Sequence, residues 1–253
     1  MFTPGVFVAA ASFALAGILI SAVRWGKRKA NGDRHPIVIG AVAFILFALF
    51  CENIFHQILI FLFPGIDELI TGNLFLYVFY GCAMAGVFEE GGRYYAFSRV
   101  IPGYDKPGAA AAYGAGHGGI ELVLSGILGL LLMAPAAFGP WEAVFWVFER
   151  TVALLGHVAL SIVVFTGVRL GKRTYVAGAI VLHMLADVPI GLYRYGVISL
   201  RVCDAAFASA VLLCGFMAAW CQRRLISASR SGDPEKGQQR NESPQSRIFN
   251  GQS

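Results

Sequence analysis

The chain has 253 residues, of which 57% are hydrophobic and only 14% are charged, and its mean hydropathy is +0.65. Such a composition is far more apolar than that of a soluble domain, so we predict an integral membrane protein. The formal net charge of +5 does not indicate a nucleic-acid partner, because the Lys and Arg residues lie in short connections between apolar segments and near the C-terminus.

Apolar segments long enough to cross a bilayer recur along the chain, since a helix needs about 20 residues to span the hydrocarbon core. The first segment, residues 1–20, lacks the positively charged start of a cleavable signal peptide and is interpreted as a retained helix. We therefore predict an all-α, polytopic membrane helical bundle of about seven transmembrane helices within a domain of residues 1–225. The predicted spans are residues 4–23, 37–63, 69–97, 109–132, 143–167, 174–194 and 202–221.

The charges of the connections predict the orientation of the bundle. The second connection carries Asp67 and Glu68 and the fourth carries Glu142, whereas the sixth, with Arg194 and Arg201, is an exception. The first, third and fifth connections are basic, with Arg24, Lys27, Arg28, Lys29, Arg34, Arg99, Lys106, Arg169, Lys172 and Arg173. Basic connections stay on the cytoplasmic side, so we expect the N-terminus outside and the C-terminus in the cytoplasm.

The last part of the chain differs in composition from the rest. From Ile226 onward it consists mainly of Ser, Gln, Asn, Arg and Pro. Such a segment cannot bury enough apolar surface to offset its ordering entropy. We predict that residues 226–253 form a disordered cytoplasmic tail.

Two carboxylates and an arginine end the third predicted span. Arg93 follows Glu90 by three residues and Glu89 by four, a spacing that allows pairing on one face of a helix. A charge at the centre of a membrane helix costs roughly 2.5–3.5 kcal/mol, so each such residue is a functional candidate.

The next three spans supply histidines and further carboxylates. His117 and Glu121 lie four residues apart in one span, and His183 and Asp187 lie four apart in another, so each pair shares a helix face. His157 lies alone in the span between them. Counted from the predicted cytoplasmic ends, these histidines and the first carboxylate of the third span lie roughly 12–20 Å into the membrane. We expect them to form one layer.

Imidazoles and carboxylates that converge in a shielded cavity suit a divalent metal such as zinc, with one position left for water. The candidate metal ligands are His117, Glu121, His157, His183 and Asp187. Alternatively, a glutamate activates water without a metal, with Glu89 or Glu90 as the general base. Spacing alone does not decide between these alternatives.

The segments FEEGGRY and GAGHGGIE and the later His-x-x-x-Asp resemble the CAAX-protease and bacteriocin-processing superfamily of intramembrane proteases. The chain is most similar to the YhfC-type intramembrane metalloproteases of that superfamily, and the resemblance extends from the first span to Cys221. It implies a proteolytic activity within the membrane.

The resemblance also implies a set of catalytic residues, which are Glu89, Glu90, Arg93, His117, His183 and Asp187. One of the two glutamates activates water, the arginine holds the acidic pair, and the two histidines act together. The aspartate stands where the prenyl proteases usually carry Asn. Here only Gly91 and Gly92 separate the second glutamate from the arginine, whereas the prenyl proteases have three residues between them.

The leading hypothesis is a membrane endopeptidase of the metallo type, with zinc as the candidate ion, or of the glutamate type. It cleaves a membrane protein or a lipidated peptide and admits water from the cytoplasmic side. One alternative is a proton- or ion-coupled transporter, because His and carboxylate relays also mark ion pathways. The other is a catalytically inert scaffold subunit that packs through small residues. In each case we expect the protein to reside in the plasma or inner membrane.

Overall fold

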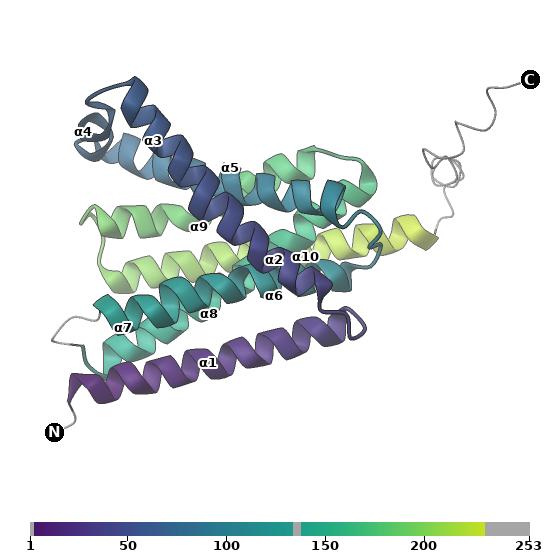
Figure 1. The fold of residues 1–253 in the computed structure, drawn as a ribbon, viewed down its shortest axis with the longest axis horizontal. Helices are drawn as coiled ribbons and strands as arrows, with labels where there is room; N and C mark the ends of the chain where they lie inside the picture. Colours follow the sequence, from purple (N-terminus) through teal and green to yellow (C-terminus); the bar gives the residue numbers. More distant parts are fainter. Residues whose placement is uncertain (1–2, 134–137, 231–253) are drawn as a thin grey trace, which may run out of the picture.

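The computed structural model describes residues 3–133 and 138–230, which form the bundle of long helices shown in Figure 1. Within these residues seven helical stretches are long and apolar enough to cross a membrane, and no strand occurs. The stretches are Pro4–Lys29, His35–Leu62, Leu74–Val100, Pro107–Leu132, Pro140–Leu170, Thr174–Arg194 and Leu200–Ser229. The predicted all-α bundle is therefore confirmed, and the protein is an integral, multi-pass membrane protein.

Three of the stretches contain π-helical segments. They are α2 (His35–Ala43) with η1 (Phe44–Cys51) and α3 (Glu52–Leu62), α5 (Leu74–Tyr95) with η2 (Ala96–Val100), and α6 (Pro107–Glu121) with η3 (Leu122–Leu128) and α7 (Gly129–Met133). The other helices are α1 (Pro4–Lys29), the short α4 (Ile66–Thr71), α8 (Pro140–Leu170), α9 (Thr174–Arg194) and α10 (Leu200–Arg230). π-Helical turns are rare and occur frequently at functional sites. Here η1 precedes Glu52 and η3 follows Glu121, two carboxylates that line an internal cavity.

Local sequence signals explain where several helices begin and end. The Asn73 side chain accepts a hydrogen bond from the Leu76 backbone N–H and caps α5. Gly171, with a φ of 65°, ends α8 in the left-handed conformation that glycine tolerates. Proline in the first turn begins four helices, because the N–H that it lacks has no partner there. These prolines are Pro4, Pro36, Pro107 and Pro140.

The first and last helices extend further than predicted. α1 continues to Lys29 instead of residue 23, and α10 continues to Arg230 instead of residue 221. Basic residues in the last turn of a helix interact favourably with the helix dipole, and the aliphatic parts of their side chains can lie along apolar surface. Both effects favour a helix that continues into a basic segment. The expected tail therefore begins as helix, which corrects its predicted start at residue 226. Residues 231–253 of that tail lie outside the described residues.

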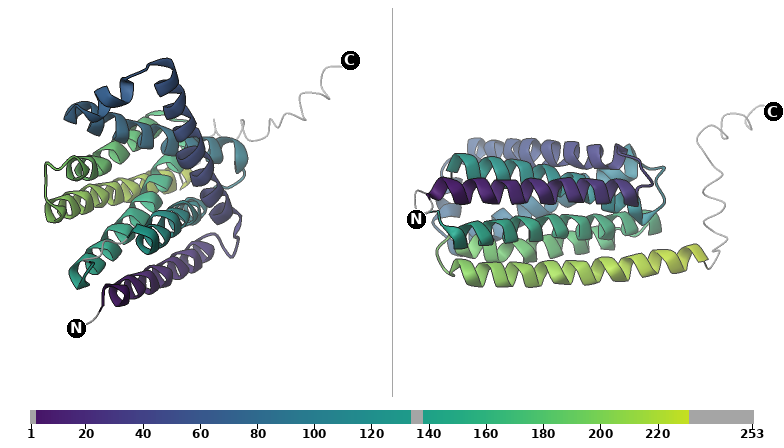
Figure 2. Two further views of the ribbon diagram at one scale, coloured as in Figure 1. Left: turned by 60° about the vertical axis from the view of Figure 1, so that its left-hand side comes forward. Right: turned by 90° about the horizontal axis from the view of Figure 1, so that it is seen from below.

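α6 packs against α1, α2 and α8 (Figures 1 and 2). Its residues 109–119 are all buried, and most are Ala or Gly, which allow neighbouring backbones to approach closely. Gly116 faces the Ile37 carbonyl of α2, and Gly114 faces the backbone of α8. These backbone contacts fix the position of His117, which follows Gly116 directly.

Replacing Gly116 with alanine should destabilise the protein, because the added Cβ would overlap the Ile37 carbonyl. Overpacking of this kind costs about 1–3 kcal/mol, and more where the backbone cannot move. We expect Gly116→Ala to lower the melting temperature of the detergent-solubilised protein, measured by size-exclusion chromatography after heating. Gly17→Ala on α1 is the control, because no atom of another helix lies within 4 Å of its added Cβ. Equal melting temperatures of the two variants would contradict the close packing of α2 on α6.

The basic connections are joined to one another at one end of the bundle. The Tyr104 hydroxyl donates a hydrogen bond to the Asp33 carboxylate, which links the connections 30–34 and 101–106. This bond lowers the pKa of Asp33 and raises the pKa of Tyr104 to about 12. Arg169, near the end of α8, donates to the Pro102 carbonyl at 2.8 Å. The assignment of this end to the cytoplasm stays a prediction from charge.

Candidate metal centre and active site

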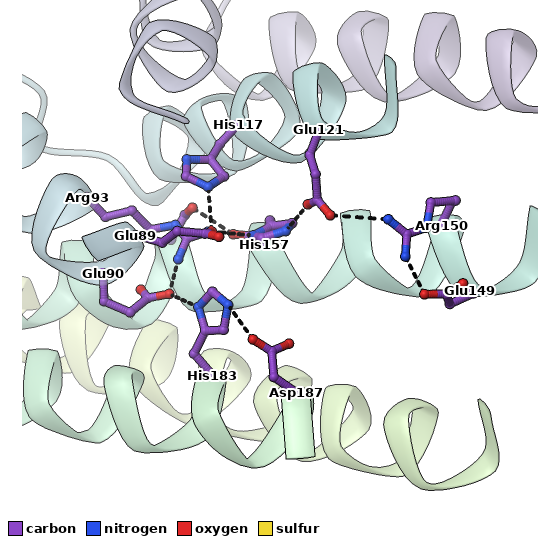
Figure 3. Close-up of polar contacts among 11 residues, drawn as sticks. Glu89, Glu90, Arg93, His117, Glu121, Glu149, Arg150, His157, His183 and Asp187 are labelled. Atoms are coloured by element: carbon purple, nitrogen blue, oxygen red, sulfur yellow. Dashed lines mark hydrogen bonds and ion pairs between the residues drawn. The ribbon is translucent and has the colours of Figure 1, made fainter. Parts of the chain in front are cut away.

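Ionisable side chains from four helices meet inside the bundle (Figure 3). They are Glu89, Glu90 and Arg93 of α5, His117 and Glu121 of α6, Glu149, Arg150 and His157 of α8, and His183 and Asp187 of α9. The structure therefore brings together all the site residues predicted from the sequence. It divides them into two groups that share Arg93.

The first group consists of Glu89, His117 and His157. Glu89 Oε2 lies 2.9 Å from His117 Nε2 and 3.6 Å from His157 Nδ1. All three residues are buried, and one ligand atom of each lies within 4.8 Å of the others. Phe44 packs edge-on against the His117 ring, with ring centroids 5.1 Å apart. Glu89, expected as a catalytic carboxylate, thus lies among the histidines that were expected as metal ligands.

The second group consists of Glu90, His183 and Asp187. His183 Nδ1–H donates to Glu90 Oε1 at 2.7 Å, and His183 Nε2 lies 3.5 Å from Asp187 Oδ2. Glu90 is fully buried, whereas the Asp187 side chain is 26% exposed. His183 therefore connects a buried carboxylate with one on the wall of a cavity. Two of the predicted metal ligands, His183 and Asp187, lie in this group.

Arg93 joins the two groups and is itself 0% exposed. Its Nη1 donates to Glu90 Oε1, and its Nη2 lies 3.5 Å from Glu89 Oε2 and 2.5 Å from His157 Nδ1. These are the contacts that the family resemblance implies for an arginine that holds the acidic pair. A guanidinium accepts no hydrogen bond, so His157 Nδ1 must be the acceptor in this contact.

The tautomer of His157 follows from that contact. Because Nδ1 accepts, Nε2 carries the hydrogen and donates to Glu121 Oε2. Glu121 in turn accepts from Arg150 Nη1 at 3.5 Å. Metal-binding histidines usually have their second ring nitrogen held by a carboxylate in this way. Glu121, predicted as a ligand, thus contacts the far side of the His157 ring.

Two further charged residues of the cluster, Glu149 and Arg150, were not predicted as site residues. Arg150 Nη2 donates to Glu149, and its guanidinium lies over the Trp146 ring at 6.0 Å. Both charged residues lie within an apolar span. Placing a charge there costs free energy, so such residues are candidates for a functional role. Arg150 also precedes His157 by seven residues, which places the two on one helix face. That spacing could have identified it.

A cavity of about 550 Å³ reaches the cluster. Its wall includes His157 and His183 at one end and Asp67, Thr71 and Arg194 at the other. It thus runs from the cluster toward the end of the bundle that holds the connections α3–α5 and α9–α10. Water entry from the cytoplasmic side stays a prediction. The cavity itself extends from the cluster away from the end with the basic connections.

The cluster has more carboxylates than cationic groups. Five carboxylates, among them Glu149 and Asp187, are accompanied by two guanidinium groups, those of Arg93 and Arg150. A buried charge without a compensating partner is costly. The excess of carboxylates over guanidinium groups is therefore compensated either by bound protons or by a bound cation.

The residues of the first group suit a divalent metal. Carboxylate oxygen and imidazole nitrogen are ordinary zinc ligands, and Glu89, His117 and His157 supply them within one small buried volume. Arg93 keeps its ion pair with Glu90 and does not depend on Glu89 for charge compensation. Among the described residues the buried His117 Nδ1 and Glu90 Oε2 have no hydrogen-bond partner. The cluster therefore contains buried nitrogen and oxygen atoms that form no hydrogen bond with other protein groups.

Seven membrane-spanning helices that enclose a buried glutamate and two histidines define a multi-pass membrane protein with a candidate intramembrane metal site. The sequence model of a family described as "YhfC intramembrane metalloprotease" matches residues 12–139 and 132–208. The chain belongs to this YhfC family, which confirms the resemblance to the YhfC-type proteins. It is 30% identical over 220 residues to the "uncharacterized membrane protein YhfC" of Bacillus subtilis (strain 168), covering 75% of this chain and 85% of that protein. No solved structure matches the chain.

Proposed function

We propose that the protein is an intramembrane metalloendopeptidase that hydrolyses a peptide bond of another membrane-associated protein. The observation that carries this proposal is the buried group of Glu89, His117 and His157 at the inner end of the cavity. The description of the family as metalloproteases supports it. A volume of 550 Å³ lies within the range of ligand pockets, about 300–1,000 Å³, and suits a short extended peptide.

Glu89, His117 and His157 are the proposed ligands of a divalent metal, for which zinc is the expected ion. Such a metal, when bound, supplies Lewis-acid activation of water and of the scissile carbonyl. Glu121 fixes the His157 ring by accepting its Nε2–H, and Arg150 fixes Glu121. Nε2 is thereby occupied by Glu121, which leaves Nδ1 as the ligand atom of His157. Its one lone pair accepts from Arg93 Nη2 in this structure, so metal binding requires that contact to open.

His183 and Asp187 are the proposed proton carriers. Asp187 lies on the cavity wall, and Glu90 fixes the His183 ring by accepting its Nδ1–H. The His183 Nε2 atom is therefore free to exchange a proton with Asp187 at 3.5 Å. A proton released when water attacks the carbonyl can pass to this pair and then to the leaving amine, which departs only when protonated. Arg93 compensates the charge of Glu90 in every protonation state of the pair.

Elemental mass spectrometry of detergent-purified protein tests the metal centre. We expect about one zinc per chain in the unsubstituted protein, as in other three-ligand catalytic zinc sites. The double variant His117→Ala, His157→Ala should contain none. His56→Ala is the matched control, because His56 also lines the cavity but lies 2.9 Å from the Tyr80 hydroxyl, outside the group. Zinc retained by the double variant would rule out this ligand set.

Hydrolysis is tested on the same preparations. The protein is incubated with single-span transmembrane peptides in detergent, and fragments are identified by mass spectrometry. We expect cleavage that stops on chelation and returns with zinc. Proton or ion flux into proteoliposomes without cleavage would favour the transporter hypothesis. A stable complex with a partner, without cleavage or flux, would favour the scaffold hypothesis.

A further inference from the structure

The cluster is closed off from the end of the bundle that carries the basic connections. Tyr113 lies next to His117, with ring centroids 5.9 Å apart, and Phe97 lies 4.7 Å from Tyr113 and 5.3 Å from Phe165. These three aromatic residues are 0% exposed and belong to one continuous hydrophobic core. The same core includes Ile101 at the basic end. Packed side chains therefore fill the space between the cluster and this end.

The opposite side of the cluster borders the cavity. The residues that line the far end of the cavity include Asp67 and Thr71 of α4, Tyr77 near the start of α5, and Arg194, the last residue of α9. We call this far end of the cavity, defined by these four residues, the mouth. The mouth thus lies at the end of the bundle away from all three basic connections.

The charges of the connections indicate which side of the membrane the mouth faces. Ten Lys and Arg residues lie in or next to the first, third and fifth connections, at the closed end of the bundle. Lys and Arg are retained on the cytoplasmic side. The closed end is then cytoplasmic, and the mouth faces the extracytoplasmic side.

We infer that the substrates are extracytoplasmic, juxtamembrane segments of other membrane proteins, which reach the cluster through the mouth. This inference rests on the proposed peptidase function. The cavity is large enough for a short extended peptide and too small for a folded domain. Asp67, Thr71 and Arg194 offer side-chain groups that can hydrogen-bond to a peptide backbone. A lipidated C-terminus on the cytoplasmic side has no comparable path through the core formed by Phe97, Tyr113 and Phe165.

Thiol labelling at two positions on either side of His157 tests the inference. Ala153 lies one helical turn before His157 and lines the cavity, whereas Ser161 lies one turn after it and is 0% exposed. A membrane-impermeant, cationic methanethiosulfonate reagent is applied to spheroplasts and to inside-out vesicles, and each site is quantified by peptide mass spectrometry. We expect Ala153→Cys to react in spheroplasts and not in inside-out vesicles. Ser161→Cys should react in neither.

Lys172→Cys marks the basic end, because Lys172 is exposed in the fifth connection. It should react only in inside-out vesicles. Reaction of Ala153→Cys only in inside-out vesicles, or in neither preparation, overturns the inference. Reaction from both sides also overturns it and is the result expected of a transporter. Ser125→Cys, a conservative change at another cavity-lining position, provides the same measurement if Ala153→Cys does not fold.

Thiol labelling does not depend on catalysis. The experiments can therefore contradict the peptidase proposal and the proposed substrate class independently of each other. If Ala153→Cys reacts only in spheroplasts but no transmembrane peptide is cleaved, the peptidase proposal fails and the extracytoplasmic mouth stands. If peptides are cleaved but the cysteine reacts only in inside-out vesicles, the peptidase proposal stands and the substrate class is wrong.

Discussion

Replacing Glu89 with glutamine is expected to reduce peptide cleavage by about 10²- to 10⁴-fold, the range found when a positioned acid or base is removed. The substitution keeps the shape of the side chain and removes the charge that lies 2.9 Å from His117 Nε2 and 3.6 Å from His157 Nδ1. Glu89 lines the inner end of the cavity, and a neutral water molecule there cannot replace the charge of its carboxylate. Cleavage of a transmembrane peptide, followed by mass spectrometry, measures the effect.

Zinc content measured on the Glu89→Gln variant separates two roles for this carboxylate. Loss of zinc together with cleavage identifies Glu89 as a ligand, whereas loss of cleavage with zinc retained identifies it as the general base. Glu68→Gln on α4 is the matched control, because Glu68 is exposed and does not line the cavity. Cleavage at the unsubstituted rate in Glu89→Gln would contradict both roles.

Replacing Arg93 with methionine should have the largest effect on stability. The guanidinium is fully buried and contacts Glu90, Glu89 and His157. Removing one partner of a buried ion pair costs about 3–5 kcal/mol, because the remaining charge is left without compensation. We expect Arg93→Met to give much less folded protein in the membrane and a lower melting temperature in detergent. The exposed Arg99, on the same helical stretch, is the control in Arg99→Met.

A second substitution tests whether charge is the cause. In the double variant Arg93→Met, Glu90→Gln the carboxylate that forms the closest ion pair with Arg93 is also neutral. A large part of the lost melting temperature should then return, although cleavage should not. If the double variant is no more stable than Arg93→Met, the packing of the arginine rather than its charge stabilises this region.

The seven spans could be predicted because each is apolar over about the thickness of a bilayer. Among the predicted starts of the spans, that of the third was the least accurate: it was expected at residue 69, whereas α5 begins at Leu74. Residues Ile66–Thr71 form the separate helix α4, and Asn73 caps the next helix. A break that depends on one capping side chain changes the mean hydropathy very little, so hydropathy did not reveal it.

The site could be predicted within each helix but not between helices. Glu89 and Glu90 are adjacent, so their side chains leave the helix about 100° apart. The structure directs Glu89 to His117 of α6 and Glu90 to His183 of α9. The packing of the whole bundle determines which helices flank α5. The spacing of residues within α5 does not predict these neighbours. For the same reason Glu121 could be placed on the face of α6 that carries His117 but not against the far nitrogen of His157.

The small-residue surface of α6 limits how the chain can evolve. Where two side chains touch, a gain of volume in one can be offset by a loss in the other. At Gly116 the neighbour is the main-chain carbonyl of Ile37, which no substitution can make smaller. Compensating pairs of changes are therefore excluded at this contact. Adaptation to other bilayers or other peptides has to occur on the lipid-facing helices and around the mouth, while the segment that positions His117 stays almost constant.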